Sequence, residues 1–236
     1  MNTNRNWILG LSFIVGMAVS ALLAGHTFRS VKRMDEFVTV KGLSEREVPA
    51  DLAIWPIAFT IAENDLTQLQ EWIGAGRKIV SEFLTESGFD PVEISNGLLQ
   101  IMDAQAAGGG FDVSKRPFRY QANITVLLRS TKVPKVKSAM ETSDKLVKQG
   151  IILSGGDYMS KPQFLFTGLN QIKPDMIQEA NRNARKAAER FAADSNSPVG
   201  AVRHAIQGPF EINDVDSSSP DRKIVRVVTT VDFYLQ

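Results

Sequence analysis

The sequence contains no cysteine and only two histidines, His26 and His204, among its 236 residues. Without cysteine there is no disulfide framework, no thiolate nucleophile and no cysteine-ligated zinc site. If His26 lies in a membrane, as argued below, the two histidines cannot share a metal ion within one folded domain. The sequence therefore excludes thiol chemistry, and it predicts no metal and no cofactor.

The chain also lacks an excess of charge of either sign. It has 27 Lys and Arg residues against 26 Asp and Glu residues, which gives a net charge of +1. A nucleic-acid-binding protein needs a concentrated basic face to displace counterions, so we expect no nucleic acid partner. Charged residues make up 22% and hydrophobic residues 43% of the chain, which is typical of a folded protein that is long enough to bury a core.

Formal charge is absent from one long stretch near the amino terminus. This stretch, residues 7–28, runs from Trp7 to Phe28, and as a helix it would span about 33 Å, close to the hydrocarbon thickness of a bilayer. A cleaved secretory signal is the alternative, because Ala18-Val19-Ser20 places small residues at a suitable spacing. The apolar run is longer than that of a usual signal, so we expect a retained transmembrane signal-anchor helix.

The expected topology is a single pass through the inner (cell) membrane. Residues 1–6 would form a short cytoplasmic amino terminus, and residues 37–236 would face the periplasm. Arg29, Lys32 and Arg33 follow the apolar stretch and by themselves favour the cytoplasm for the carboxyl side, but long domains translocate largely regardless of flanking charge.

Small residues recur at every fourth position of the apolar stretch. They would form one line along a helix and allow close packing against a second helix in lipid, although anchor segments are often simply rich in small residues. The residues are Ser12, Gly16, Ser20 and Ala24.

Period-two hydrophobic alternation predicts several strands, and period-3.6 stripes predict three helices. One helix begins with a capping pattern of Asp65 and Gln68 and ends at Gly88, one runs from Pro134 to Gly150, and an alanine-rich one begins near Pro174-Asp175. The expected strands are a hairpin of Phe37–Val48 and Asp51–Ala62 about Pro49-Ala50, with Pro56 at an edge or bulge, and segments at 92–103, 119–129, 151–167, 200–212 and 223–235.

This order predicts an α+β fold, in which an amino-terminal transmembrane helix is followed by an antiparallel or mixed sheet with helices packed on one face. Two β-rich halves, each wrapped by helix, are a further arrangement that the order allows.

Few residues form a pattern that carries chemistry. Gly108-Gly109-Gly110 lacks the Lys-Ser/Thr of a phosphate loop and favours a hairpin tip. Asp214, Asp216 and Asp221 lack EF-hand spacing, so ordinary hydrated carboxylates are favoured over calcium ligands. His204 has no nucleophile-elbow serine to serve, and Ser44-Glu45-Arg46-Glu47 is expected to be an exposed charged strand end. We therefore expect no catalytic residue and no enzyme.

Two segments resemble the SIMPL-domain family of bacterial envelope proteins, which includes a periplasmic immunogenic antigen and oxidative-stress proteins. VTVKGLSEREVPADLAIWPIAF resembles the opening strands of the family, with Gly42 in the first strand and Asp51 in the following turn. FLFTGLNQIKPDMIQEANRNARKAAERFAADSNSPVGAVRHAIQGPFEI resembles its strand, Ala- and Arg-rich helix and strand, and the closing strand at 226–235 agrees too. The resemblance covers residues 37–236.

The resemblance implies an exported or envelope-associated α+β protein that forms a ring-like or channel-like homo-oligomer, with a link to oxidative-stress tolerance in some members and no established catalytic residue. The longer apolar stretch at residues 7–28 departs from a typical exported member. Two other functions remain open: a small-ligand-binding module with a pocket between helices and sheet, and a hydrolase using Asp214, Asp216 or His204.

Overall fold

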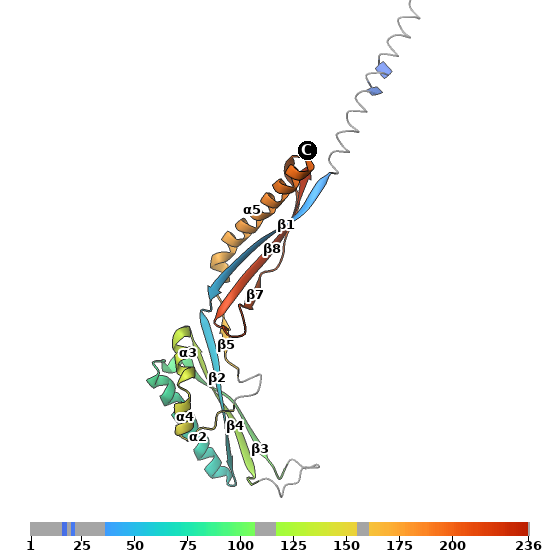
Figure 1. Ribbon diagram of the computed structural model, residues 1–236. Coiled ribbons are helices and arrows are strands. Elements are labelled where there is room, and N and C mark those ends of the chain that lie inside the picture. Colours follow the sequence, from blue (N-terminus) through green and yellow to red (C-terminus); the bar gives the residue numbers. More distant parts are fainter. Residues whose placement is uncertain (1–15, 18–19, 22–35, 107–116, 155–160, 236) are drawn as a thin grey trace, which may run out of the picture. The chain divides into compact units, whose positions relative to one another are not determined.

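The protein is described by a computed structural model that covers residues 16–17, 20–21, 36–106, 117–154 and 161–235 (Figure 1). From residue 37 on, the described chain forms strands and helices. They are β1 (Phe37–Pro49), β2 (Leu52–Glu63), α2 (Leu66–Glu86), the 3-10 helix η1 (Pro91–Glu93), β3 (Ile94–Asp103), β4 (Tyr120–Ser130), α3 (Val133–Glu141), α4 (Asp144–Lys148), β5 (Gln163–Leu165), α5 (Leu169–Ser195), β6 (Val199–Gln207), β7 (Glu211–Asp214) and β8 (Arg222–Leu235).

These elements form two compact units, each with its own sheet. Unit 1 contains the described residues up to Arg46, Gln171–Glu211 and those from Val225 on. Unit 2 contains Glu47–Asn170 and Ile212–Ile224. The α+β class is confirmed, and the sheet is divided in two, as the arrangement of two β-rich halves allowed.

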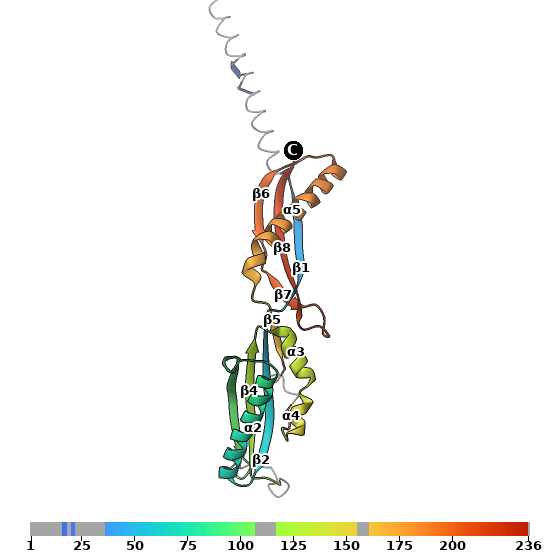
Figure 2. The same cartoon turned by 90° about the vertical axis from the view of Figure 1, so that its left-hand side faces the viewer.

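Unit 2 is a four-stranded sheet in the order β3-β4-β2-β5, with α2, α3 and α4 on one face (Figure 2). The β2–β4 pair is antiparallel over its full length, from Ala53 opposite Ser130 to Glu63 opposite Tyr120. Alternate β4 residues face the helices and are fully buried, as the period-two pattern predicts. These residues are Ala122, Ile124, Val126 and Leu128.

Pro56 lies in β2 opposite Leu127 of β4. Ala58 and Thr60 follow Pro56 by two and four residues, so their backbone groups point to the same side of β2. On that side, away from β4, the Thr60 N–H donates to the Ile152 carbonyl at 3.3 Å, and the Ala58 carbonyl accepts from the Ser154 N–H at 2.8 Å. The missing N–H of Pro56 therefore faces away from β4 as well, and the β2–β4 ladder loses no bond. The described strand order places β2 between β4 and β5, and its register with β4 runs unbroken through Pro56, so the predicted edge or bulge is wrong.

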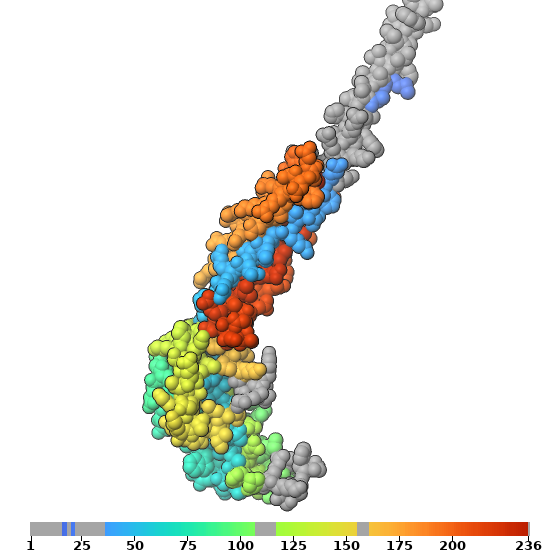
Figure 3. Space-filling view, viewed as in Figure 1, coloured from blue at the N-terminus to red at the C-terminus, as the bar shows by residue number. Residues whose placement is uncertain are grey.

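The second sheet has the order β1-β8-β6, and in unit 1 α5 packs on one of its faces. The short strand β7 also pairs with β8, but all of it except Glu211 belongs to unit 2. Figure 3 shows β1 in blue against α5 in orange. The helix buries a stripe of small side chains against the sheet, which allows a close approach. The residues at this contact are Val38, Ala184, Ala188, Val231 and Phe233.

The predicted β1–β2 hairpin is wrong, although both strands lie where expected. β1 neighbours β8, whereas β2 pairs with β4 and β5 in the other sheet. At Pro49-Ala50 the chain leaves one sheet for the other: the Ala50 N–H donates to the Asp221 carbonyl at 2.8 Å and the Asp51 N–H to that of Leu165 at 2.9 Å. Period-two alternation fixes which face of a strand is buried and does not identify its partner.

The helix boundaries hold in part. Asp65 accepts the Gln68 N–H at 2.9 Å, and Gly88, with a positive φ of 88°, follows the end of α2, as predicted. The single helix expected between Pro134 and Gly150 is two short ones, α3 and α4. The helix expected near Pro174 begins at Leu169, with the proline inside it.

Two predicted strands also differ from the structure. The segment at 200–212 is divided into β6 and β7. Of the segment at 151–167, the described part contains β5 and a single bridge between Leu153 and Phe59. Gly108-Gly109-Gly110 lies outside the described residues.

Most of the expected anchor, residues 7–28, lies outside the described residues, and so do Ser12 and Ala24. Gly16 and Ser20 are helical, and the Ser20 hydroxyl donates to the Gly16 carbonyl at 2.8 Å. No helix in the part of the chain that the structure describes is both long enough and apolar enough for a bilayer crossing.

Candidate functional site

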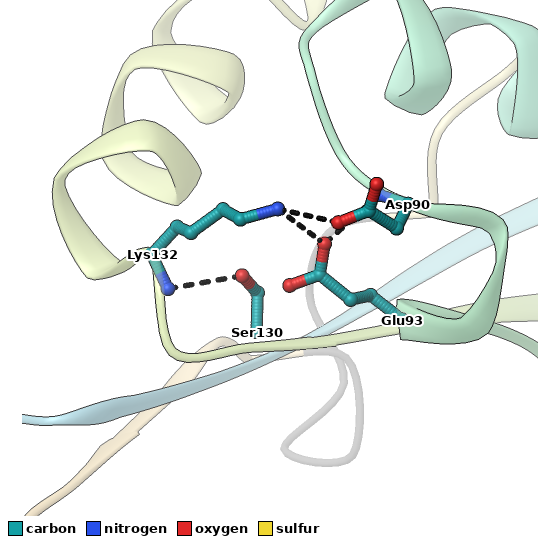
Figure 4. Close-up of polar contacts among 4 residues, drawn as sticks. All are labelled: Asp90, Glu93, Ser130 and Lys132. Carbon is teal, nitrogen blue, oxygen red and sulfur yellow. Dashed lines mark hydrogen bonds and ion pairs between the residues drawn. The ribbon is translucent and has the colours of Figure 1, made fainter.

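A cluster of charged and polar side chains lies where η1 leads into β3 in unit 2 (Figure 4). Asp90 precedes the 3-10 helix, Pro91 occupies its first position and Glu93 its third, which is the spacing of a capping box. The Asp90 N–H donates to Glu93 Oε2 at 2.9 Å, so the turn holds the Glu93 carboxylate in a fixed place.

Lys132 completes this cluster from the turn between β4 and α3. Its Nζ lies 2.7 Å from Asp90 Oδ2 and 2.9 Å from Glu93 Oε2. The buried Ser130 hydroxyl accepts the Lys132 N–H at 3.0 Å and also bonds to Glu93. The cluster thus ties two connections that lie about 40 residues apart in the sequence.

Glu93 and Lys132 keep their charges at neutral pH. Burial alone would raise the pKa of Glu93, but hydrogen bonds from the Ser130 hydroxyl, the Asp90 N–H and the Lys132 ammonium outweigh it and lower the pKa to about 2. Hydrogen bonds to Asp90 and then Glu93 raise the pKa of Lys132. Proton transfer near neutral pH needs pKa values shifted in the opposite directions, so this geometry supports a structural clamp.

The sequence contains a helix-cap pattern at Asp90 and Glu93 that the predictions above did not use. Asp90-Pro91-Val92-Glu93 fits an N-terminal helix cap with proline at the first position. No local signal identifies Lys132 as the partner, because the β3–β4 hairpin brings it there.

The three aspartates considered for calcium each have a separate partner. Asp214 pairs with Lys223, and Asp216 accepts the N–H of Ser218 at 2.7 Å within its own turn. Asp221 pairs with Lys137 at 2.9 Å, and this hydrogen bond is the main reason that its pKa is lowered. No group of three potential metal ligands occurs among the residues that the structure covers.

His204 is an exposed residue of β6 and lies opposite Asp232 of β8. The Asp232 carboxylate accepts the Thr39 hydroxyl at 2.7 Å. No hydrogen bond to the His204 side chain occurs among the described residues, so the structure does not assemble a base and nucleophile around it.

The charged end of β1 is more structured than expected. Ser44 is buried, and its hydroxyl donates to Glu179 Oε2 of α5 at 2.9 Å. Arg46 lies 3.7 Å from the same carboxylate oxygen. The expectation of an exposed strand end is therefore wrong for Ser44, which contacts Glu179 of the helix. Gly42 and Ser44 lie two residues apart in β1, so both point to the face that α5 covers. This alternation could have predicted the contact.

Gly42 and Asp51, which carried the resemblance in the first segment, have structural roles. A Cβ at position 42 would lie 1.9 Å from the Ala180 carbonyl oxygen and 2.5 Å from the Ala184 nitrogen, so only glycine lets α5 approach β1 this closely. The Asp51 carboxylate accepts the N–H of Thr167 at 2.8 Å and that of Gly168 at 2.9 Å, directly before α5 begins.

A hollow of about 410 Å³ lies at the end of α5 in unit 1. Its lining includes Arg185 and Glu189, whose side chains pair at 3.2 Å, and Asn196 and Ser197 of the following loop. It is open, and its lining also includes Ala192 of α5 and Val199, the first residue of β6.

Two antiparallel sheets, one covered by α5 and the other by α2, α3 and α4, make this an α+β protein. The polar contacts described above connect turns, strands and helix ends within each unit. The chain matches the model of the SIMPL family, described as a protein of unknown function (DUF541), over residues 38–229. Because the match covers most of the chain, the chain belongs to the SIMPL family, and the resemblance is confirmed. A search of curated proteins gave no match.

Proposed function

We propose that this chain is a membrane-anchored SIMPL protein of the inner membrane, with residues 37–236 in the periplasm, and that it assembles with copies of itself and is not an enzyme. The main observation in support of assembly is that large apolar side chains of the edge strand β3 are exposed. Leu98 is 60% and Ile101 48% exposed. No described strand pairs with the outer edge of β3.

An edge strand with exposed apolar side chains such as Leu98 and Ile101 is a liability for a monomer, because a strand of another chain can add to the edge and cover them. A second copy that adds a strand beside Leu98 and Ile101 would cover these side chains. The resemblance to a family with a ring-like or channel-like member supports the same proposal.

Native mass spectrometry of the full chain in detergent tests the assembly. We expect more than one copy for the natural sequence and dissociation for the double variant Leu98→Lys and Ile101→Lys. Val92→Lys is the control, because Val92 is 91% exposed and lies outside the strands. Both changes are on the surface and should shift the stability of each unit by less than about 0.5 kcal/mol per site. A natural chain that remains monomeric over a wide concentration range contradicts the proposal.

The proposed anchor is the uncharged stretch at residues 7–28, and its line of small residues from Ser12 to Ala24 is the proposed packing face between anchors. Membrane fractionation, protease treatment of spheroplasts and amino-terminal sequencing test it. We expect an uncleaved chain that stays with the membranes and whose carboxyl-terminal part is digested from outside. Sequencing that begins at or after Ala21, or a protected carboxyl-terminal part in intact spheroplasts, would refute the anchor or its orientation.

The absence of an enzymatic activity is supported by the fixed charges of Glu93 and Lys132 and by the separate partners of Asp214 and Asp221. A hydrolase panel tests it with the natural chain and with His204→Ala and Asp214→Ala. Turnover that either alanine variant abolishes would establish the hydrolase alternative. We also propose the link to oxidative-stress tolerance that the resemblance implies. Peroxide challenge of a deletion strain tests this link.

The hollow beside Arg185 is the observation that keeps ligand binding as a second candidate. Its volume of about 410 Å³ is within the range of small-molecule sites. A thermal-shift screen of envelope metabolites tests it, since a ligand that binds only the folded chain raises the melting temperature. A hit that Arg185→Ala abolishes would favour this function.

A further inference from the structure

One end of unit 1, here called the proximal end, gathers the start of β1, the end of β8, the start of β6 and the end of α5 (Figures 1 and 2). The Glu36 carbonyl accepts the Leu235 N–H at 2.9 Å, and Leu235 lies opposite Val199. Ser195, the last residue of α5, is four residues before Val199. The described body of the chain therefore begins at this end.

The length of the preceding sequence ties the proximal end to the proposed anchor. Glu36 follows Phe28, the last residue of the proposed anchor, by eight residues, which can span at most about 29 Å when fully extended. The strand β1 has 13 residues and is about 44 Å long. If the anchor spans the bilayer, the proximal end is thus the end of unit 1 that is held within reach of the lipid headgroups.

The side chains at the proximal end are those that membrane interfaces favour. Phe37 is 43% exposed, and the Arg203 guanidinium lies over its ring at 4.1 Å and 6.0 Å from that of Tyr234. On the helix side Phe191 is 49% exposed and follows Arg190. Aromatic rings rest at the level of the headgroups, and an arginine beside them can bond to phosphate.

Acidic groups also lie near this end, so attraction to anionic lipid is not the main force. Glu36 and Asp194 are exposed, whereas Glu189 is paired with Arg185 at 3.2 Å. Insertion of the aromatic rings does not depend on lipid charge, and zwitterionic phosphatidylcholine should be sufficient.

We propose that the proximal end of unit 1 rests on the headgroup layer, with Phe37 and Phe191 at the lipid interface. The proposal rests on the anchoring proposed above and adds a second contact with the membrane. The lipid surface is the favoured occupant because the tether holds these rings within reach of the headgroups in every copy, whether or not the anchors pack together.

Because the chain has no cysteine, a single introduced cysteine can be labelled at one place. The full chain is reconstituted in phosphatidylcholine vesicles that contain a headgroup spin-labelled phosphatidylcholine, and quenching of a fluorophore is measured. Ala193→Cys reports on the proximal end. Gln171→Cys is the control, on the same helix about 33 Å away. Both side chains are exposed.

We expect several-fold stronger quenching at position 193 than at 171, and we expect Phe191→Ser to reduce it while Leu43→Ser, an exposed position of β1 six residues beyond Phe37, does not. Equal quenching at both positions in protein that floats with the vesicles overturns this inference and leaves the anchor intact. Protection of position 193 from an aqueous quencher without quenching by the lipid spin label indicates a second copy and also overturns it. Protein that fails to float refutes the anchor itself, and the inference with it.

Discussion

Replacing Gly42 by alanine should destabilise unit 1. We expect a larger loss than for alanine at any other glycine that the structure describes. The added Cβ would lie 1.9 Å from the Ala180 carbonyl oxygen, 2.5 Å from the Ala184 nitrogen and 2.8 Å from the Ala184 Cβ. Two of these three atoms belong to the backbone of α5, so no side-chain rotation relieves the clash. The helix must move away from β1, and buried contacts along its alanine stripe must be lost.

The expected cost is about 3 kcal/mol, at the upper end of the range for overpacked cores, because backbone atoms are displaced. For a chain of this length that loss lowers the melting temperature by about 6 to 12 °C. Thermal unfolding followed by far-ultraviolet circular dichroism measures it. The double variant Gly42→Ala with Ala184→Gly should not recover the loss, since it removes one contact and leaves the clash with the Ala180 oxygen.

Gly74→Ala in α2 is the matched control with the opposite sign. A Cβ at Gly74 meets no atom within 4 Å, and alanine in an exposed helix interior is favoured over glycine by about 0.5–1 kcal/mol. If Gly42→Ala melts together with the natural chain, β1 and α5 do not approach as closely as the structure indicates, and the structural role assigned to Gly42 is wrong.

Three further changes test the polar contacts. Glu93→Gln should lower the unfolding free energy at pH 7 by about 2 kcal/mol and flatten its decline in acid: the folded pKa of about 2 lies below the ordinary 4.5, so this contribution is complete above pH 4.5 and is lost as the pH falls through 2. Urea titrations at a series of pH values measure this, and an unchanged slope contradicts it. Thr229→Val should be neutral or stabilise by up to about 1 kcal/mol, because the buried Thr229 hydroxyl bonds to no described atom; a clear loss in urea would reveal a partner. Asp51→Ala should cost about 1–3 kcal/mol by leaving the N–H groups of Thr167 and Gly168 without their acceptor, and Asp51→Asn should cost less; equal melting of both variants with the natural chain would refute this role.

Local patterns in the sequence predicted most elements correctly. The alternation at residues 119–129 and 223–235 identified β4 and β8 and their buried faces, and Asp65 and Gly88 fixed the ends of α2. These features depend on neighbours within a few residues, because side-chain period, caps and positive φ are local properties of the backbone. Membership of the SIMPL family could likewise be inferred from the order of segments in the sequence.

Pairing and polar partners were decided by the tertiary structure. The chain crosses from one sheet to the other at Pro49-Ala50, and no local pattern separates such a crossing from a hairpin turn. Lys132 reaches Glu93, and Glu179 reaches Ser44, only because distant segments are brought together. Hydrophobic periodicity tells which side of an element is buried, whereas the partner of that side depends on packing between residues far apart in the chain.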